Sequence, residues 1–397
     1  MTALMAPGSA VGTRAGDWHG TIVLCAANSW DDVKLADRHM AERLTAHAPV
    51  LYVDPPVSRL TRFNNPAVAA SLTGDRLRVV GPNLARYTPL VLPKPRHPMM
   101  RATSSLLVRR QLRAAIRRLG GDVGAIVSTW LFIDAYGIAG DVPHVYWWQD
   151  DPVGAAALWG VSADRLERGE NELASASDLI AAVNDEVTGR WRARGFPAAF
   201  LPNGCDAPFF AAVDDAEDPP DVDLPGPIAG FVGHLNSRTD LALLEAVADA
   251  GTSLLLIGPK DPEFEPERFD RLAGRPNVAY VGPQPFEALP SYLKATDVGL
   301  VPYADTPFNR GSFPMKTLEY LSAGRAVVAT PLPAVRWLDT DLVTLGATPQ
   351  QFAAAVADEA ARERGAELVA ARQAFAARHS WAERASQLAG LLESLRG

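Results

Sequence analysis

The chain has 397 residues, of which 48% are apolar and 21% charged, and its formal net charge is −8. This length exceeds what one compact core usually holds, so two domains are expected. No apolar run approaches the ~18 residues of a transmembrane helix, so we expect a cytoplasmic protein, at most peripheral on the inner face of the cell membrane. The cysteines Cys25 and Cys205 have no neighbours at metal-ligand spacing, and a reducing cytosol fits them better than a disulfide framework.

Charge is divided unevenly along the chain. Residues 1–121 carry 17 Lys and Arg against 7 Asp and Glu, whereas the remaining residues carry 21 against 39. Eleven of the basic residues and no acid lie within 76–121. Residues 1–20 are rich in small residues and lack a long apolar core, so they are predicted to be a disordered leader rather than a signal peptide.

Apolar runs and helical patterns alternate through the first half of the chain. The segment 208–227 then holds six acids and five prolines in twenty residues, which is the composition of a linker. After it the alternation starts again. Strands are predicted at 22–26, 51–53, 77–80, 125–127, 142–146, 179–183, 228–233, 253–257, 278–281, 298–301 and 326–329, and helices at 33–47, 99–119, 162–176, 185–194, 241–250, 349–377 and 380–395.

Two successive α/β halves predict a fold of two facing Rossmann-like domains with a cleft between them and C-terminal helices. The first domain is expected over 21–207 and the second over 228–378, with 208–227 as the linker. A C-terminal helix over 379–397 can cross back to the first domain.

A helix and then a buried strand are predicted downstream of residue 310. Gly311 and Ser312 stand where the helix would begin, and Gly324 is placed to end it. Lys316 and Glu319 are three residues apart and lie on one side of the helix start. A cation and free backbone N–H groups there suit a phosphate, and a carboxylate one turn further suits a sugar diol. The alternative is a surface ion pair of little energetic value.

The sequence lacks several common enzyme signatures. It has no G-x-G-x-x-G, no G-x-x-x-x-G-K-[ST], no G-x-S-x-G and no H-E-x-x-H. It does hold a series of short phrases in a characteristic order: Leu201-Pro-Asn-Gly-Cys-Asp206, Gly230-Phe-Val-Gly-His-Leu235, Ile257-Gly-Pro259, Pro276-Asn-Val-Ala-Tyr-Val-Gly282, Leu289-Pro-Ser-Tyr-Leu293, Thr296-Asp-Val-Gly-Leu-Val-Pro302 and Pro314-Met-Lys-Thr-Leu-Glu-Tyr-Leu-Ser-Ala-Gly324. This order resembles the GT-B glycosyltransferases of the large bacterial family 4 of retaining enzymes, over roughly residues 21–390.

The resemblance implies that the second domain binds a nucleoside-diphosphate sugar and the first an acceptor. Glu319 matches the second glutamate of the family's Glu-x7-Glu motif, which would bind the ribose diol. The first glutamate falls at Gly311, so backbone amides of Gly311 and Ser312 would take over part of its contact with the donor sugar. The family's phosphate-binding Arg falls at His234, which follows Gly233, and the pyrophosphate would rely on Arg238, Lys316 and His234. For His234 the alternative is a loop histidine with an ordinary partner. No bound metal and no other cofactor is expected.

Two places in the first domain are candidates for the acceptor side. The segment 28–31 follows the first strand, and the segment 147–151 follows another strand with two tryptophans beside two carboxylates. Aromatic platforms beside carboxylates hold sugar rings, so Asp150 or Asp151 would contact hydroxyls or steer the nucleophile. The alternative for Asp150 is a cap on the following segment.

The basic segment 86–118 suits an anionic membrane surface, because its helix combines arginines with an apolar stripe. The alternative is a solvated helix whose stripe lies in the core. Nucleic-acid binding is disfavoured, since aromatic residues between the basic ones are missing apart from Tyr87.

The sequence therefore predicts a glycosyltransferase that moves a hexose-like sugar from a nucleoside diphosphate to a glycan, polysaccharide or glycolipid acceptor, with retention and without a metal. The first alternative is a non-catalytic protein of the same fold that binds a sugar nucleotide or glycan, and the second is a sugar-nucleotide epimerase. The sequence does not decide the base, the sugar, the acceptor, the linkage or the oligomeric state.

Overall fold

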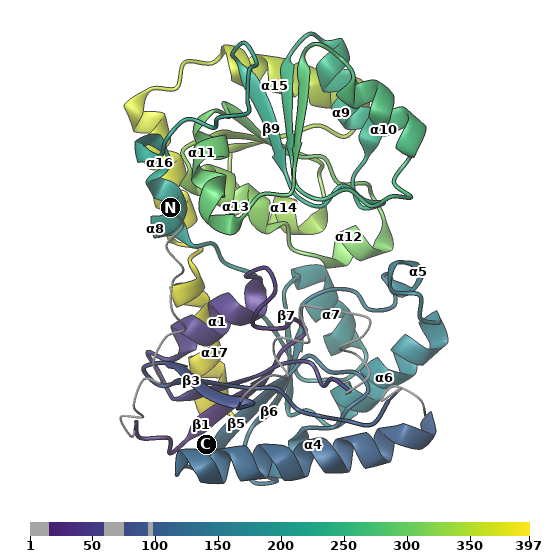
Figure 1. The fold of residues 1–397 in the computed structure, drawn as a ribbon, viewed down its shortest axis with the longest axis vertical. Coiled ribbons are helices and arrows are strands. Elements are labelled where there is room, and N and C mark those ends of the chain that lie inside the picture. The colour runs from purple at the N-terminus through teal and green to yellow at the C-terminus, as the bar shows by residue number, and fades with distance from the viewer. Residues whose placement is uncertain (1–15, 59–74, 94–97) are drawn as a thin grey trace, which may run out of the picture. The chain divides into compact units, whose positions relative to one another are not determined.

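The computed structural model describes residues 16–58, 75–93 and 98–397 (Figure 1). Most of the predicted leader, residues 1–15, lies outside the described residues, as do residues 94–97 of the basic segment. Internal contacts divide the chain into unit 1, which holds residues 1–32 and 44–143, and unit 2, which holds residues 33–43 and 144–397. The predicted domain limits are not tested by this division and stay predictions.

Unit 1 consists mainly of strands and one long helix. The first turn of this helix contains no acidic residue, and its last turn contains Arg117 and Arg118. The elements of unit 1 are β1 (Thr21–Cys25), β2 (Val50–Val53), β3 (Leu77–Gly81), β4 (Leu84–Tyr87), α4 (Pro98–Leu119), β5 (Val123–Ser128) and the 3-10 turn η1 (Tyr136–Ile138).

Unit 2 alternates strands and helices along most of its length. Its elements in the first half of the chain are α1 (Ala36–Leu44, whose last residue falls in unit 1), β6 (His144–Trp148), α5 (Ala156–Trp159), α6 (Ala163–Ser175), β7 (Leu179–Ala182), α7 (Asp185–Ala193), β8 (Ala198–Phe200), α8 (Ala207–Ala211) and η2 (Val213–Asp215). The later elements are β9 (Ile228–Val232), α9 (Leu241–Asp249), β10 (Ser253–Ile257), α10 (Pro266–Ala273), β11 (Val278–Gly282), η3 (Phe286–Ala288), α11 (Leu289–Lys294), β12 (Val298–Val301), α12 (Pro307–Gly311), α13 (Met315–Ser322), β13 (Ala326–Ala329), α14 (Pro333–Trp337), β14 (Val343–Leu345), α15 (Pro349–Ala361), α16 (Ala366–Ala377) and α17 (Trp381–Ser394).

The strands form an eight-stranded sheet in the order β3-β4-β2-β1-β5-β6-β7-β8 and a six-stranded sheet in the order β11-β10-β9-β12-β13-β14. In the eight-stranded sheet the pairs β4–β2, β2–β1, β1–β5, β6–β7 and β7–β8 are parallel. All pairs of the six-stranded sheet are parallel as well. β3 pairs antiparallel with β4 at the edge. Strands buried on both faces read as continuous apolar runs, which is why most of these strands could be predicted from sequence. The strands β4, β8 and β14 were not predicted.

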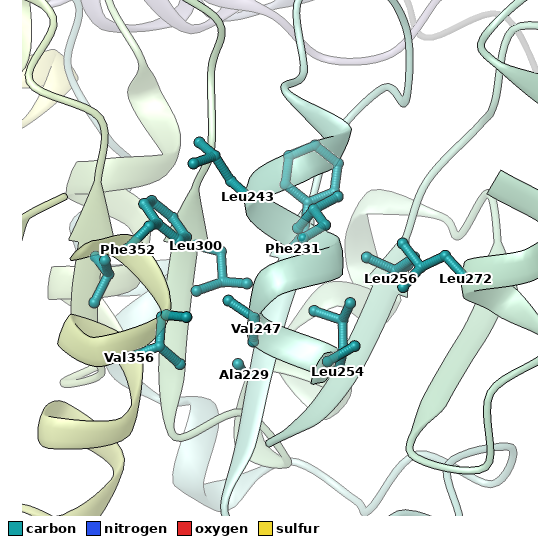
Figure 2. Close-up of a cluster of buried hydrophobic side chains, with 14 of the residues drawn as sticks. Ala229, Phe231, Leu243, Val247, Leu254, Leu256, Leu272, Leu300, Phe352 and Val356 are labelled. Atoms are coloured by element: carbon teal, nitrogen blue, oxygen red, sulfur yellow. The ribbon is translucent and has the colours of Figure 1, made fainter. Parts of the chain in front are cut away.

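The core of the six-stranded sheet lies between the sheet and the helices α9, α10 and α15. Figure 2 shows Ala229, Phe231 and Leu300 of the strands packed against Val247 of α9 and Phe352 of α15. Successive side chains of a strand alternate between faces, so Gly299 faces away from this core. A Cβ at Gly299 would lie 2.2 Å from the Tyr320 ring, which places α13 closely against the opposite face.

The predicted helix over 349–377 differs from the structure. The pattern over 349–377 forms two helices, because the chain is extended at Arg362 and Gly365 between α15 and α16. This break lets Arg372 of α16 turn back, donating to the carbonyl of Gly324 at 3.1 Å and pairing with Glu359 of α15 at 3.4 Å.

The basic helix α4 packs its apolar stripe into unit 1. Val108, Leu112 and Ile116 are buried, as the alternative prediction for this helix required. Arg113 donates to the carbonyl of Ile138 at 3.2 Å, and Arg118 pairs with Asp75 at 2.6 Å. Part of the positive charge of α4 is therefore used within the unit. None of the helices in the described part of the chain combines the length and the apolar character that a membrane span requires.

Replacing Phe352 with alanine should lower the free energy of unfolding by about 3–5 kcal/mol, because a fully buried aromatic ring leaves a cavity. Urea unfolding measures the loss. Leu345→Ala is the control, since that side chain is 42% exposed and its truncation should change stability by less than about 1 kcal/mol. Equal losses for both variants would contradict the placement of Phe352 in the core.

Candidate functional site

The predicted donor residues gather at the carboxyl ends of β9 and β12, which are neighbours in the six-stranded sheet. The loop that follows β9 carries His234 and Arg238, and the segment that follows β12 carries Ser312, Lys316 and Glu319. In open parallel sheets, neighbouring strand ends of this kind form the ligand crevice.

The segment after β12 forms two short helices rather than the single helix start that was predicted. Thr306 accepts a hydrogen bond from the N–H of Asn309 at 3.2 Å, and Pro307 holds the first position of α12. The chain is then extended at Ser312, and α13 begins after Pro314. The Thr306-Pro307 pair is an N-cap signal that would have located the earlier helix. The predicted end of α13 is confirmed, since Gly324 follows with a φ of +70°.

Asn309 fixes Arg238 beside this segment. Its amide nitrogen donates to the carbonyl of Arg238 at 2.8 Å, and its amide oxygen accepts from Nε of Arg238 at 3.0 Å. The guanidinium also lies over the rings of Tyr303 and Phe308, at 5.3 and 4.6 Å from their centroids. Arg238 is thus held in one orientation by a side chain that is only 1% exposed and that sequence reasoning missed.

Asp150 lies against the same segment. The hydroxyl of Ser312 is 2.9 Å from Oδ1 of Asp150 and 2.9 Å from the carbonyl of Phe308. Burial raises the pKa of Asp150, while the charge of Arg238 and the hydrogen bond from Ser312 act in the opposite direction. Arg238, Ser312 and Asp150 therefore form one electrostatic cluster in unit 2.

The neighbouring Asp151 has a different position. Its Oδ1 accepts from the N–H of Gly154 at 2.8 Å, so Asp151 caps the turn that had been considered for Asp150. Its Oδ2 is 3.5 Å from Nη2 of Arg190 on α7. Asp151 is buried, and of its two carboxylate oxygens Oδ2 is the one near Arg190.

Gly311 is packed against both Asp151 and the tryptophan of β6. A Cβ at residue 311 would lie 2.9 Å from Cβ of Asp151 and 3.0 Å from Cη2 of Trp148. Such contacts are too short for a side chain, so a glutamate at this position would require α12 and β6 to move apart.

Trp147 and Trp148 are both buried and do not form exposed platforms for a sugar. The indole N–H of Trp148 donates to Glu170 of α6, which also lies 3.4 Å from the hydroxyl of Tyr146. Glu170 therefore holds the ring that packs against Gly311.

Lys316 and Glu319 form a close pair on α13. Nζ of Lys316 is 2.6 Å from Oε2 of Glu319, whose side chain is almost completely buried. The predicted phrase at 201–206 runs beside this helix, because the hydroxyl of Ser322 donates to the carbonyl of Ala207 at 2.8 Å. Desolvation, followed by the charge of Glu319, raises the pKa of the Cys205 thiol in that phrase.

His234 and Gly233 occupy the turn after β9. Nε2 of His234 is 2.6 Å from Oδ1 of Asp261, so this histidine has a partner in its own loop region. Gly233 is in close contact with Gly258, where a Cβ would lie 2.0 Å from the carbonyl oxygen of Gly233. The predicted roles of both residues toward a phosphate stay predictions.

A cavity of about 170 Å³ opens beside Gly311. Two helices of unit 2 supply its charged walls, α7 on one side and α12 on the other. The residues that line it are Asp151, Glu186, Val187, Arg190, Pro307, Arg310 and Gly311.

The predicted acceptor segment 28–31 in unit 1 is held by a buried ion pair. Arg86 lies 2.8 Å from Asp54 and 2.7 Å from Asp31, and Asp54 also accepts from the N–H of Trp30 at 2.8 Å. The carboxylate of Asp54 is completely buried. This network orders the loop after β1, and neither Asp54 nor Arg86 was singled out from the sequence.

Within residues 16–58, 75–93 and 98–397, no group of three or more His, Cys, Asp or Glu side chains is arranged to hold a metal ion. Asp221, in the predicted linker, accepts from the hydroxyl of Tyr292 at 2.9 Å.

Part of the chain matches a known family model and a known relative. Residues 226–361 match the family model described as Glycosyl transferases group 1. The chain is 29% identical over 173 residues to the putative teichuronic acid biosynthesis glycosyltransferase TuaH of Bacillus subtilis (strain 168). That match covers 43% of this chain and 42% of TuaH, so the chain aligns with about two fifths of this relative's length.

Solved structures share the fold over almost the whole chain. Sucrose-phosphate synthase from Thermosynechococcus elongatus has a TM-score of 0.70 at 16% identity, and the match covers 95% of this chain and 99% of that one. HepE from Anabaena, in complex with UDP and glucose, has a TM-score of 0.66 at 16% identity, with 95% and 100% covered. The predicted two-domain GT-B fold with parallel sheets and C-terminal helices is therefore confirmed.

The free energy of unfolding should fall as the pH rises through the range in which Glu170 ionises. Burial raises the pKa of Glu170 from 4.5 to about 7. Between these values the unfolded carboxyl loses its proton while the folded one keeps it, so stability falls and stays lower above pH 7.

Glu170→Gln should remove this fall, as measured by urea unfolding at pH 5 and pH 8. Glu167→Gln on the same helix is the control, because Glu167 is exposed. A fall that persists in the Glu170 variant would show that another group causes it.

Proposed function

We propose that this chain, whose residues 226–361 match the family model described as Glycosyl transferases group 1, transfers a sugar from a nucleoside diphosphate to a glycan, polysaccharide or glycolipid with retention of configuration. The observation that carries the proposal is the pair formed by Lys316 and Glu319 at the carboxyl end of β12. A nearly buried carboxylate with a lysine at 2.6 Å and an open strand end beside it matches the needs of a ribose diol next to a diphosphate.

Arg238 supports the same donor. Its guanidinium is fixed by Asn309 and by two aromatic rings before any ligand arrives. Negative charge develops on the diphosphate as the bond to the sugar breaks, and fixed cations stabilise it without reorganisation. We assign this role to Arg238 and Lys316, with His234 as a further candidate if it leaves Asp261.

Asp150 and Ser312 take the place of the missing motif glutamate in this proposal. A residue larger than glycine does not fit at position 311, whereas Asp150 lies next to it on β6's loop and contacts Ser312 at 2.9 Å. A carboxylate and a hydroxyl can together accept from and donate to the hydroxyls of a sugar ring. Asp151, which caps a turn, acts through position rather than through contact with the reacting atoms.

The relatives support a donor class and a setting. HepE was solved with UDP and glucose, and TuaH is described as acting in teichuronic acid biosynthesis. We therefore propose a UDP-linked hexose or hexose derivative as donor and a cell-envelope polysaccharide precursor as acceptor. The enzyme would work in the cytoplasm at the inner face of the membrane. The exposed side of α4, which carries Leu106, Arg110 and Arg117, would contact the anionic membrane surface.

A thermal-shift panel of UDP, GDP, dTDP, ADP and their sugar conjugates tests the donor. A ligand that binds the folded state alone raises its stability in proportion to the logarithm of concentration over affinity. A clear shift for one base identifies the donor class, and slow hydrolysis of that donor without acceptor separates the enzyme from a non-catalytic sugar-nucleotide binder. Release of an altered sugar would instead indicate an epimerase.

Glu319→Ala should weaken nucleotide binding by about 1–3 kcal/mol, the usual effect of losing a charged hydrogen-bond partner. Calorimetry with the nucleotide selected in the panel measures it. Glu319→Gln keeps the shape and should lose part of the affinity. Unchanged affinity in both variants would remove Glu319 from the site.

Lys316→Ala should weaken nucleoside diphosphates far more than the bare nucleoside, because the lost charge faces the phosphates. The same titrations with the diphosphate and with the nucleoside give the comparison. Equal losses for both ligands would count against a phosphate role for Lys316.

A further inference from the structure

We propose that Arg190 and Arg310 form a subsite for a carboxylate on the transferred sugar, so that the donor is the nucleoside diphosphate of a uronic-acid-type sugar. The inference rests on the proposed function and names its substrate class. It starts from the cavity beside Gly311, whose charged walls belong to α7 and α12.

The cavity has the scale of one sugar ring. Its volume of about 170 Å³ corresponds to on the order of five water molecules at ~30 Å³ each. Arg190 and Arg310 both line it, and Gly311 leaves its floor free of a side chain. Asp151 and Glu186 line the same cavity, so a ligand there would meet both arginines and these two carboxylates.

Both guanidinium groups are held loosely. Arg190 is 3.5 Å from Asp151, and its guanidinium lies 5.9 Å from the ring centroid of Trp148. Arg310 is 3.8 Å from Glu186 and 3.3 Å from Asp305. Good charge-assisted hydrogen bonds of arginine are about 2.7–2.9 Å long. The remaining donors of both side chains are therefore available to a better acceptor.

Other arginines of unit 2 contrast with this pair. Arg268 meets Glu245 at 2.6 and 2.9 Å, and Arg238 is fixed by Asn309 at 3.0 Å. Arg190 and Arg310 are about half exposed and keep long contacts, although carboxylates stand within reach. Two weakly engaged guanidinium forks across one ring-sized cavity suit a planar carboxylate, which accepts bidentate hydrogen bonds.

The backbone beneath the pair is firmly placed. The side-chain amide of Asn184, the N-cap of α7, donates to the carbonyl of Arg310 at 2.7 Å. The same side chain accepts from the N–H of Glu186 at 2.9 Å. The two arginines are thus carried by elements that are tied together, while their side chains keep freedom to close on a ligand.

The position of the cavity points to the donor sugar rather than to the acceptor. In the proposed site Glu319 binds the ribose and Lys316 the diphosphate, and Gly311 and Arg310 precede them on the same continuous segment. Followed backwards from Glu319 through Lys316 to Gly311, the segment would meet the nucleoside, then the diphosphate and then the sugar, which is their order in the donor. The ring attached to the diphosphate would therefore lie at the cavity.

The test compares sugar nucleotides that differ only in the acidic group. Wild-type protein is titrated calorimetrically with UDP, UDP-glucose and UDP-glucuronate, or with GDP, GDP-mannose and GDP-mannuronate where the nucleotide panel favours guanine. We expect the uronate to bind at least about tenfold more tightly than the neutral sugar, as two charge-assisted hydrogen bonds would give. Arg190→Gln and Arg310→Gln should each reduce this preference to about twofold or less, with the affinity for the bare diphosphate unchanged.

Matched variants separate the subsite from a general loss of charge or folding. Arg271→Gln removes an exposed arginine on α10 and should keep the full preference for the uronate. Arg310→Lys keeps the charge without the fork and should recover part of it. Melting curves confirm that each variant is folded.

Each result bears on a different proposal. Equal or tighter binding of the neutral sugar by the wild type would overturn the subsite and leave the proposed function intact if the diphosphate still binds. A uronate preference that survives both arginine substitutions would also overturn it. If no nucleotide binds the wild type, the proposed function fails and the subsite fails with it.

Discussion

The arrangement of the candidate site depends on the close contact at Gly311. A Cβ there would meet Asp151 at 2.9 Å and Trp148 at 3.0 Å, so the absence of a side chain is what allows α12 to approach β6. This approach brings Ser312 within 2.9 Å of Asp150, and a cavity of about 170 Å³ opens beside residue 311. The lack of a side chain at residue 311 thus underlies two features of the candidate site.

Supporting contacts fix the partners of Gly311. Trp148 donates to the buried carboxylate of Glu170, Asp151 accepts from the N–H of Gly154, and Asn184 donates to the carbonyl of Arg310. Each of these bonds orients an element rather than a ligand. Side chains that would meet a substrate are therefore positioned by neighbours that do not, which is the arrangement that precise binding requires.

Sequence patterns predicted the parts of the site that are formed by residues close together in the sequence. Lys316 and Glu319 are three residues apart on one helix, and apolar strand runs located the strand ends around them. The contact of Asp150 with Ser312 joins residues 162 positions apart, and no local pattern contains it. The N-cap residue Thr306 gave a weak sequence signal for the helix that carries Asn309. The hydrogen bonds between Asn309 and Arg238, however, depend on how the loop after β9 folds back. Trp147 and Trp148 were predicted as aromatic platforms for a sugar ring, whereas a sheet covered on both faces buries both.

The charges of this site argue for a function rather than for a purely structural role. Withdrawing Asp150 and Glu319 from water costs free energy, and the one hydrogen-bond partner that each has among the described residues does not offset that cost as well as apolar packing would. Arg238 is likewise held by an amide and aromatic rings, and among the described residues no carboxylate forms a salt bridge with it. A protein that had lost its ligand would gain stability by replacing such groups with apolar ones. Their presence together at neighbouring strand ends, where a ligand would complete their hydrogen bonding, favours a site that still binds a charged substrate.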